Sequence, residues 1–199
     1  MLNFLRPALS RVLTPVGETL ARTGLTPNAI TVTGTVGVVA AALVFYPRGD
    51  LFWGTVVITV FVLFDMLDGA VARVTGTTST WGAFLDSCMD RVADAAIFSG
   101  LVLWLTGGGH NELLAVLALF CLVAGALVSY VKARAEGLGY TCNVGIAERT
   151  ERLIVGLVGA GLSGLGVPYA LHIGLWLLAA ASAVTVVQRF AVVHKQVTA

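Results

Sequence analysis

The stretch that decides the fold is residues 51–105, LFWGTVVITVFVLFDMLDGAVARVTGTTSTWGAFLDSCMDRVADAAIFSGLVLWL. An uncharged run from Leu51 to Phe64 leads directly into Asp65, a turn follows at residues 76–80, and a second apolar run ends at Leu105. Two such runs joined by a short turn predict antiparallel helices in a membrane. Every acidic residue of the stretch lies toward the turn, so one end of this helix pair is expected to be polar.

The rest of the chain extends the same pattern. Of its 199 residues, 57% are hydrophobic and only 12% are charged, whereas a soluble domain carries about 25% charged residues. Its surface must therefore be covered partly by lipid. We predict an all-α membrane protein of one domain, residues 1–199, whose bundle of six transmembrane helices lies within residues 26–191. The four further apolar runs are residues 29–46, 113–131, 153–167 and 169–187.

The N-terminal residues 1–23 differ from these runs. Leucines recur there at helical spacing, with arginines and one glutamate between them. This pattern predicts an amphipathic helix in the headgroup plane, and the alternative is a plain N-terminal extension. Thr26 and Pro27 then have the residue types of a helix cap and a first helical position, so the first span is expected to begin there.

Basic residues indicate the orientation in the membrane. Six spans place both termini on one side, and eleven of the twelve Lys and Arg residues then fall on that side, with Arg48 alone on the other. Because cytoplasmic loops are enriched in basic residues, we expect both termini and the polar end to face the cytoplasm, in the plasma membrane.

Five aspartates gather at the polar end. Asp65 and Asp68 are three residues apart, and Asp86, Asp90 and Asp94 follow at steps of four, so each set is expected on one face of its helix. Ionised carboxylates are costly in a membrane and share a pocket only where a cation compensates them. An all-oxygen site favours a hard ion, so we expect two Mg²⁺ or Mn²⁺ ions that would clamp a pyrophosphate.

We assign the metal site to Asp65, Asp68, Asp86 and Asp90 and leave Asp94 out. The alternative is that these aspartates form structural ion pairs with Arg73 and Arg91. The three cysteines and three histidines show no ligand spacing, so no zinc site and no disulfide is expected. We also expect no nucleic acid partner.

The segment from Asp65 to Asp90 resembles the signature of the CDP-alcohol phosphotransferases, DxxDGxxAR followed by GxxxDxxxD. Residues 65–73, DMLDGAVAR, and residues 82–90, GAFLDSCMD, match it at every fixed position. The resemblance implies a homodimeric membrane enzyme that transfers a phosphatidyl group from CDP-diacylglycerol to an alcohol at a cytoplasm-facing cavity and releases CMP. It implies that Asp90 contributes to the metal site and is the general base. The residues it implies for CDP-lipid binding are Pro27, Thr31, Asp68, Gly69, Ala72, Arg73 and Gly82.

A basic set indicates the alcohol. Cations near the mouth of a cavity suit a phosphorylated acceptor, because arginine forks match phosphate oxygens. Residues 132–137 and 145–152 resemble the actinobacterial phosphatidylinositol phosphate synthases, which implies inositol 1-phosphate as acceptor. By that resemblance its phosphate would be held by Lys132, Arg152 and Arg189, with Arg134 and Arg149 close by.

Several alternatives stay open. Glycerol 3-phosphate is a second acceptor that needs cations, which would make the chain a phosphatidylglycerophosphate synthase. The basic residues can also reflect orientation and anionic headgroups alone. Outside enzymes, an ion-coupled transporter would use the aspartates as a relay, although transporter carboxylates often lie near the midplane on broken helices. A non-catalytic metal-binding scaffold is the remaining alternative.

Overall fold

The computed structural model describes residues 15, 19–20, 22 and 24–198. These residues form helices and connecting loops, without a strand in the described part of the chain. The amphipathic helix expected over residues 1–23 falls almost wholly outside them. The elements are α2 (Pro27–Phe45), the 3-10 helix η2 (Tyr46–Arg48), α3 (Leu51–Asp65), α4 (Leu67–Thr75), α5 (Thr80–Thr106), α6 (Glu112–Gly137), α7 (Arg149–Gly164) and α8 (Ala170–Val197).

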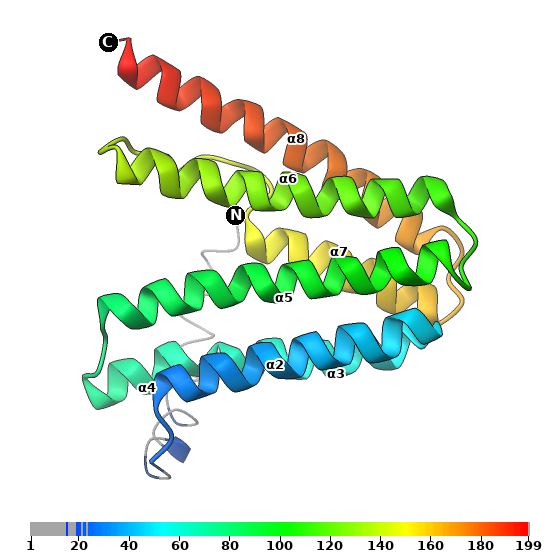
Figure 1. Ribbon diagram of the computed structural model, residues 1–199, viewed down its shortest axis with the longest axis horizontal. Helices are drawn as coiled ribbons and strands as arrows, with labels where there is room; N and C mark the ends of the chain where they lie inside the picture. The colour runs from blue at the N-terminus through cyan, green and yellow to red at the C-terminus, as the bar shows by residue number, and fades with distance from the viewer. Residues whose placement is uncertain (1–14, 16–18, 21, 23, 199) are drawn as a thin grey trace.

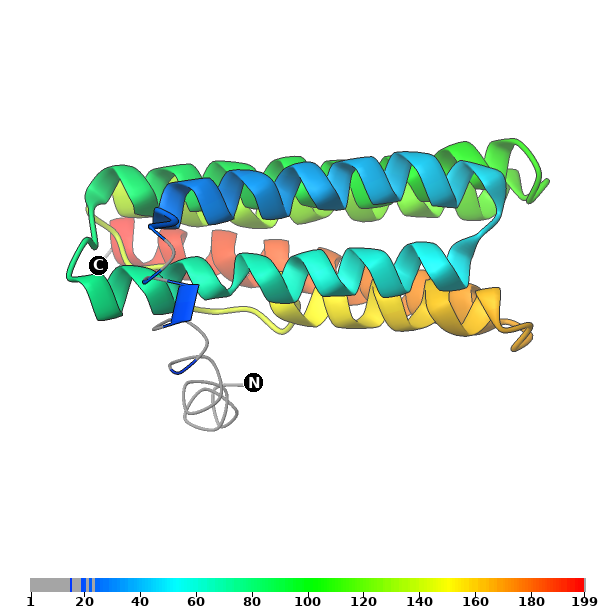
Figure 2. The ribbon, with the colours of Figure 1, turned by 90° about the horizontal axis from the view of Figure 1, so that it is seen from below.

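Six long helices stand side by side as a closed ring. Around the ring, α2 packs against α3, α3 against α7, α7 against α8, α8 against α6, α6 against α5, and α5 against α2. Figures 1 and 2 show the helices running roughly antiparallel, with tight turns at one end and α4 and the C-terminus at the other. The bundle therefore has two ends, and the helices alternate in direction between them.

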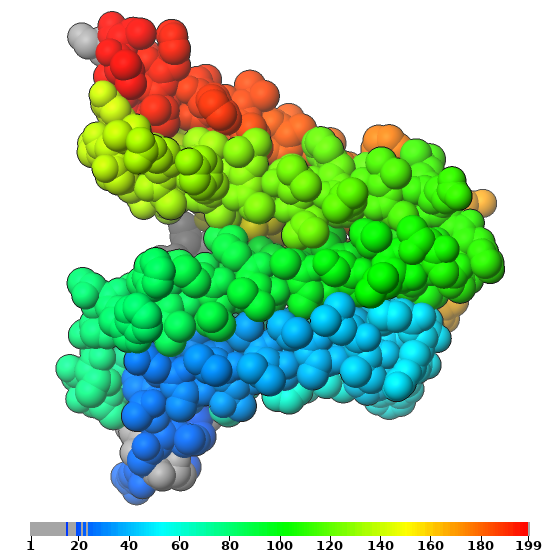
Figure 3. Space-filling view, viewed as in Figure 1, coloured from blue at the N-terminus to red at the C-terminus, as the bar shows by residue number. Residues whose placement is uncertain are grey.

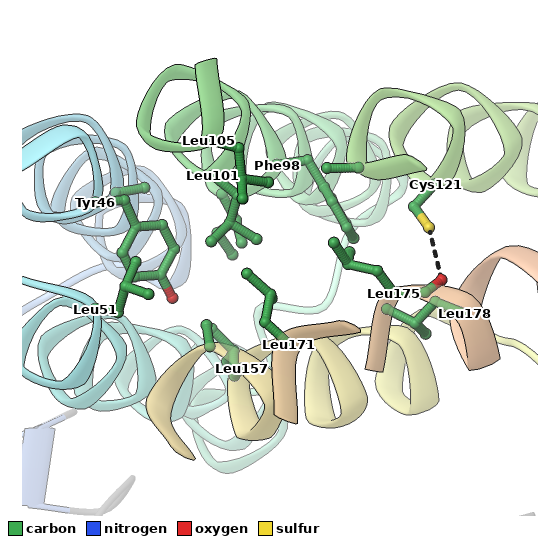
Figure 4. Packing of buried hydrophobic residues seen from close by; sticks show 14 of the residues in the cluster. Tyr46, Leu51, Phe98, Leu101, Leu105, Cys121, Leu157, Leu171, Leu175 and Leu178 are labelled. Carbon is green, nitrogen blue, oxygen red and sulfur yellow. Dashed lines mark hydrogen bonds between the residues drawn. The ribbon is translucent and has the colours of Figure 1, made fainter. Parts of the chain in front are cut away.

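The centre of the ring is an apolar core to which all six helices contribute. Side chains such as Tyr46, Leu101 and Leu175 are fully buried and converge between the helices (Figure 4). The buried hydroxyl of Tyr46 is paired with the Thr55 hydroxyl at 2.9 Å, as a buried polar group requires. Close packing of α2 on α5 depends on Gly100, where an added Cβ would lie 2.5 Å from the carbonyl oxygen of Ala42.

Four helical stretches are long and apolar enough to cross a membrane: residues 27–48, 51–75, 112–137 and 170–197. The helices α5 and α7 lie beside them in the ring but do not meet this criterion. Their sequences explain why, because α5 carries several charges in its first half and α7 has only 16 residues. The helical membrane-protein fold is as predicted, whereas the count of six crossings stays a prediction.

Local signals in the sequence explain where the helices begin. Thr26 caps α2 by accepting a hydrogen bond from the Ala29 amide at 3.3 Å, and Pro27 is the first helical residue, as predicted.

One boundary differs from the expected pattern. The helix is interrupted at Met66, so Asp65 ends α3 and Asp68 lies in the first turn of α4. The two aspartates therefore stand on either side of a one-residue break, and their place on one face stays a prediction.

Candidate active site

The functional residues expected from the sequence gather at one end of the bundle. This is the end where α2, α5 and α7 begin and where α4, α6 and α8 end (Figure 1). The chain returns to it three times because consecutive helices are antiparallel. Residues from 27 to 189 are thereby brought to one end, although the sequence separates them widely.

Three of the predicted metal ligands form a cluster. One carboxylate oxygen from each of Asp65, Asp86 and Asp90 lies within 4.8 Å of the other two. Oδ1 of Asp65 is buried and has no hydrogen-bond partner in the described part of the chain. Three carboxylates so close together repel one another unless a cation or a proton compensates them. The donor set therefore fits a hard divalent cation with oxygen ligands.

The fourth predicted ligand, Asp68, is turned to a neighbouring position. Its Oδ2 accepts a hydrogen bond from the Thr31 hydroxyl of α2 at 2.6 Å, and its Oδ1 accepts one from the Gly69 amide. Asp68 is not one of the three residues whose carboxylate oxygens all lie within 4.8 Å of one another. The side chain of Asp68 therefore lies at the edge of the cluster, and its role as a metal ligand remains a prediction.

The position of Asp65 depends on a glycine that the sequence did not single out. An added Cβ at Gly34 of α2 would lie 3.0 Å from Cβ of Asp65. A larger residue at this position would push α3 and its terminal carboxylate away from α2. The available signal was a glycine between two threonines, Thr33 and Thr35, inside an otherwise apolar span.

A first cavity, of about 190 Å³, opens beside the cluster between α2, α4 and α5. Nearly all the residues implied for CDP-lipid binding line it: Pro27, Thr31, Asp68, Gly69, Ala72 and Gly82. Arg73 is exposed at the end of α4 and is not among the lining residues. The sequence did not identify Asn28 and Ser79, which also line this cavity. Ser79 had a signal as a helix cap, and it does accept a hydrogen bond from the Gly82 amide at 3.0 Å.

A second cavity, of about 410 Å³, lies on the other side of the cluster between α5, α6, α7 and α8. Figure 3 shows the surface hollowed between α5 and α6 at this end. Four of the five residues in the predicted basic set line the second cavity, whereas Arg134 is exposed and lies outside it. The four are Lys132, Arg149, Arg152 and Arg189.

These cations are held in place to different degrees. Nη1 of Arg149 lies 2.6 Å from Oδ1 of Asp90. The Arg189 side chain is buried and donates from Nε to the Val144 carbonyl at 2.9 Å and from Nη1 to the Val128 carbonyl. Lys132 is half-buried and lies 3.8 Å from Glu136. Contacts within the protein therefore already hold these cations at the second cavity.

The structure also shows where Asp94 belongs. It is buried and receives a hydrogen bond from Nη2 of Arg152 at 3.2 Å, and Nε of Arg149 lies 3.5 Å from its other oxygen. The Arg91 guanidinium lies 3.9 Å from Asp94 and 3.7 Å from Asp90. The alternative of ion pairs with Arg73 and Arg91 is therefore met in part: Arg91 lies within 4.0 Å of both Asp90 and Asp94, whereas none of the ion pairs among the described residues involves Arg73.

The carboxylate cluster separates the two cavities. Asp86 lines the first cavity and Asp90 lines the second, and the two residues are one helical turn apart on α5. A molecule in each cavity would meet the other at the carboxylates. This arrangement suits a transfer between two substrates and differs from a relay at the membrane midplane.

Known proteins have the same sequence pattern and fold. The model of the CDP-alcohol phosphatidyltransferase family matches residues 24–187. The phosphatidylinositol phosphate synthase of Streptomyces avermitilis is 51% identical, over 98% of this chain and 84% of its own length. That of Mycobacterium tuberculosis is 47% identical, over 92% of this chain and 86% of its own length.

Solved structures agree with this likeness. A crystal structure of M. tuberculosis phosphatidylinositol phosphate synthase with CDP-DAG bound superposes with a TM-score of 0.88 at 47% identity, over 92% of this chain and 94% of that one. A second, in complex with manganese and citrate, has a TM-score of 0.86 at 47% identity and covers 91% of this chain and 88% of that one.

Proposed function

Because this chain belongs to the CDP-alcohol phosphatidyltransferase family, we propose that it transfers the phosphatidyl group of CDP-diacylglycerol to inositol 1-phosphate, giving phosphatidylinositol phosphate and CMP. The observation that carries this proposal is the carboxylate cluster between two cavities of different character. The first is lined by glycines and small polar residues, and the second by five cations, the four of the basic set and Arg91. The similar synthases reported above are named for the product phosphatidylinositol phosphate, which supports the proposal.

The cluster is proposed to hold two Mg²⁺ or Mn²⁺ ions. Asp65, Asp86 and Asp90 would bind them, with Asp68 completing the set, and the buried, unpaired Oδ1 of Asp65 supports this assignment. When bound, the ions supply charge neutralisation of the pyrophosphate and of the departing CMP. The structure of the M. tuberculosis enzyme in complex with manganese supports a divalent metal ion.

The residues of the first cavity are proposed to bind the CDP end of the lipid. Gly69 and Gly82 present no side chain toward it, so a nucleotide can approach the backbone of α4 and α5 closely. Thr31 orients Asp68 through their 2.6 Å hydrogen bond. Arg73, exposed at the end of α4, is proposed to contact the nucleotide from outside the cavity.

Asp90 is proposed to act as the general base because it faces the second cavity. It would accept the proton of the acceptor hydroxyl as that oxygen bonds to the phosphorus carrying the diacylglycerol. The bond from this phosphorus to the CMP oxygen breaks, and CMP leaves with the electron pair. Arg149, 2.6 Å from Asp90, fixes the orientation of this carboxylate.

The basic set is proposed to hold the acceptor phosphate. Lys132, Arg149, Arg152 and Arg189 converge on the second cavity from three helices, and Arg134 adds positive charge outside it. Such a site would repel cationic alcohols and retain a phosphorylated one. Inositol 1-phosphate and glycerol 3-phosphate share this chemistry, so the experiment must separate them.

The protein is proposed to cross the plasma membrane six times as a homodimer, with the site and both termini in the cytoplasm. Among the described residues, the end with the site carries nearly all the Lys and Arg, and Arg48 lies at the opposite end. This asymmetry supports the orientation. Light scattering of the detergent-solubilised protein tests the homodimer, and cysteine labelling from either side of a membrane vesicle tests the topology.

Release of CMP by the purified protein in detergent tests the function. The assay would contain CDP-diacylglycerol, Mn²⁺ or Mg²⁺, and one acceptor at a time: inositol 1-phosphate, glycerol 3-phosphate, free inositol or serine. Metal-dependent release with inositol 1-phosphate alone is expected. Release with glycerol 3-phosphate instead would keep the cluster mechanism and reject the acceptor.

A further inference from the structure

The loop between α6 and α7, residues 138–148, has no regular structure, but two of its residues are buried in the bundle. Cys142 and Ala147 within it are buried, with 0% and 2% of their surface exposed. The loop carries the chain from the end of α6 back to the start of α7, as Figure 2 shows. Its path therefore decides where α7 and its first arginine begin.

One face of α8 holds this loop through three polar side chains, Thr185, Arg189 and Gln196. Their spacing of four and seven residues places them on the same face of the helix. Gln196 donates to the Thr141 carbonyl at 2.7 Å and accepts from the Thr141 amide at 3.0 Å. Arg189 donates to the Val144 carbonyl at 2.9 Å.

Thr185 makes the contact nearest to the site. Its hydroxyl oxygen accepts hydrogen bonds from the amides of Ile146 at 3.2 Å and Ala147 at 3.0 Å, and it donates to Ala181 at 2.8 Å. The side chain is fully buried. Gly145 lies against it with φ of +142°, and an added Cβ there would meet Cγ2 of Thr185 at 2.5 Å. This close fit requires glycine on the loop and a hydroxyl on the helix.

The residues after this contact are the arginines of the second cavity. The Ala147 carbonyl accepts a hydrogen bond from Nη1 of Arg152 at 3.1 Å, and the Glu148 carbonyl accepts the Arg152 amide at 3.1 Å. Arg149, the first residue of α7, reaches Asp90. A shift of the loop backbone at residues 146–147 would therefore move both arginines.

We propose that Thr185 is a positioning residue for the acceptor half of the site: by fixing the amides of Ile146 and Ala147, it sets the start of α7 and so the places of Arg149 and Arg152. The inference rests on the proposed function. Thr185 lines neither cavity and touches no substrate in this account, so it acts only through the loop.

Thr185→Val tests the role because valine keeps the size of threonine and removes the hydroxyl. We expect the KM for inositol 1-phosphate to rise by about tenfold, since small misplacements of binding groups have effects of this size. The KM for CDP-diacylglycerol should stay within about twofold, because the first cavity is built from other helices. Thr185→Ser keeps the hydroxyl and should restore the acceptor KM.

Hydrogen exchange of the loop amides and a substitution on the loop side test the same contact between α8 and the loop. Hydrogen exchange followed by mass spectrometry should show faster exchange of the Ile146 and Ala147 amides in Thr185→Val but not in Thr185→Ser. Gly145→Ala should raise the acceptor KM from the loop side. Thr59→Val is the matched control, because the Thr59 hydroxyl donates within its own helix to the Thr55 carbonyl at 2.7 Å, and its KM values should not change.

An unchanged acceptor KM in Thr185→Val would overturn the inference, whether or not the amides exchange faster. So would an equal rise in the KM of both substrates, which would indicate a general structural role. If the wild-type protein uses another phosphorylated acceptor, the KM values of the variants are compared with that acceptor. A wrong acceptor in the proposed function can then be told apart from a wrong role for Thr185. No CMP release from wild-type protein with any acceptor would remove the proposed function and this inference together.

Discussion

Arg152 and Asp94 form an ion pair inside the bundle, with Nη2 of the arginine 3.2 Å from Oδ2 of the aspartate. Both are buried, with 2% and 8% of their surface exposed. The pair connects α5, which carries Asp86 and Asp90 of the cluster, to α7, which carries two cations of the second cavity. It therefore fixes the separation between the proposed base, Asp90, and the groups that would hold the acceptor phosphate.

Asp94→Asn should therefore destabilise the protein and weaken acceptor binding. Removing one partner leaves the Arg152 charge buried without its counter-ion, which costs on the order of 3–5 kcal/mol. Thermal unfolding in detergent should show a lower midpoint, and the acceptor KM should rise. Glu136→Gln is the control, since its pair with Lys132 is more exposed and should change stability little. An unchanged unfolding midpoint for Asp94→Asn would contradict this account of the pair.

Asp65→Asn should weaken metal binding, because it removes one charged ligand from the cluster at nearly constant size. We expect weaker Mn²⁺ binding, measured by electron paramagnetic resonance, and a loss of CMP release of at least about a hundredfold. Chelation with EDTA should abolish release from the wild-type protein, and added Mn²⁺ should restore it. Asp50→Asn, at the opposite end of the bundle, should bind Mn²⁺ like wild type. Equal Mn²⁺ affinity in Asp65→Asn and wild type would show that Asp65 is not a metal ligand.

Asp90→Asn should separate binding from turnover. The asparagine cannot take the acceptor proton, so kcat should fall by about 10²–10⁴-fold. CDP-diacylglycerol should still bind in the presence of metal, because the first cavity is lined by other residues. Equilibrium binding of the labelled lipid, measured beside CMP release, checks both statements. Turnover near the wild-type rate would reject Asp90 as the base.

Gly82→Val should impair the donor side alone. A Cβ at Gly82 would already lie 3.2 Å from the Ser79 hydroxyl, and the two further methyl groups of valine would fill part of the first cavity. We expect the KM for CDP-diacylglycerol to rise by about tenfold while the acceptor KM stays nearly constant. Gly108→Val is the control, because an added Cβ there meets nothing within 4 Å. A rise confined to the acceptor KM would mean that the first cavity binds the acceptor and not the CDP-lipid.

Much of this site could be predicted from local sequence. The spacing of Asp65, Asp86 and Asp90 across two antiparallel helices was enough to expect them together, because side-chain direction in a helix follows from spacing. The cap at Thr26 and Pro27 could also be predicted, since it depends on adjacent residues. Apolar runs located the helices, although the charges of α5 hide how much of that helix is buried in the bundle.

Contacts between residues far apart in the sequence could not be predicted from local spacing. The partner of Asp94 is 58 residues away, and that of Ile146 is 39 residues away, so no spacing rule connects them. The break at Met66 was missed because no proline or glycine marks it. The hydrogen bond of Asp68 to Thr31 also depends on the packing of α4 on α2, which no local pattern predicts.

The carboxylate cluster is proposed to join a CDP-lipid cavity to a site for inositol 1-phosphate. Mass spectrometry of the lipid product would identify the acceptor from a mixture of CDP-diacylglycerol, Mn²⁺ and equal amounts of inositol 1-phosphate and glycerol 3-phosphate. We predict that phosphatidylinositol phosphate is the main product and that it disappears on chelation of the metal. A product made chiefly from glycerol 3-phosphate would reject inositol 1-phosphate as the acceptor, and the same product without metal would reject the metal site.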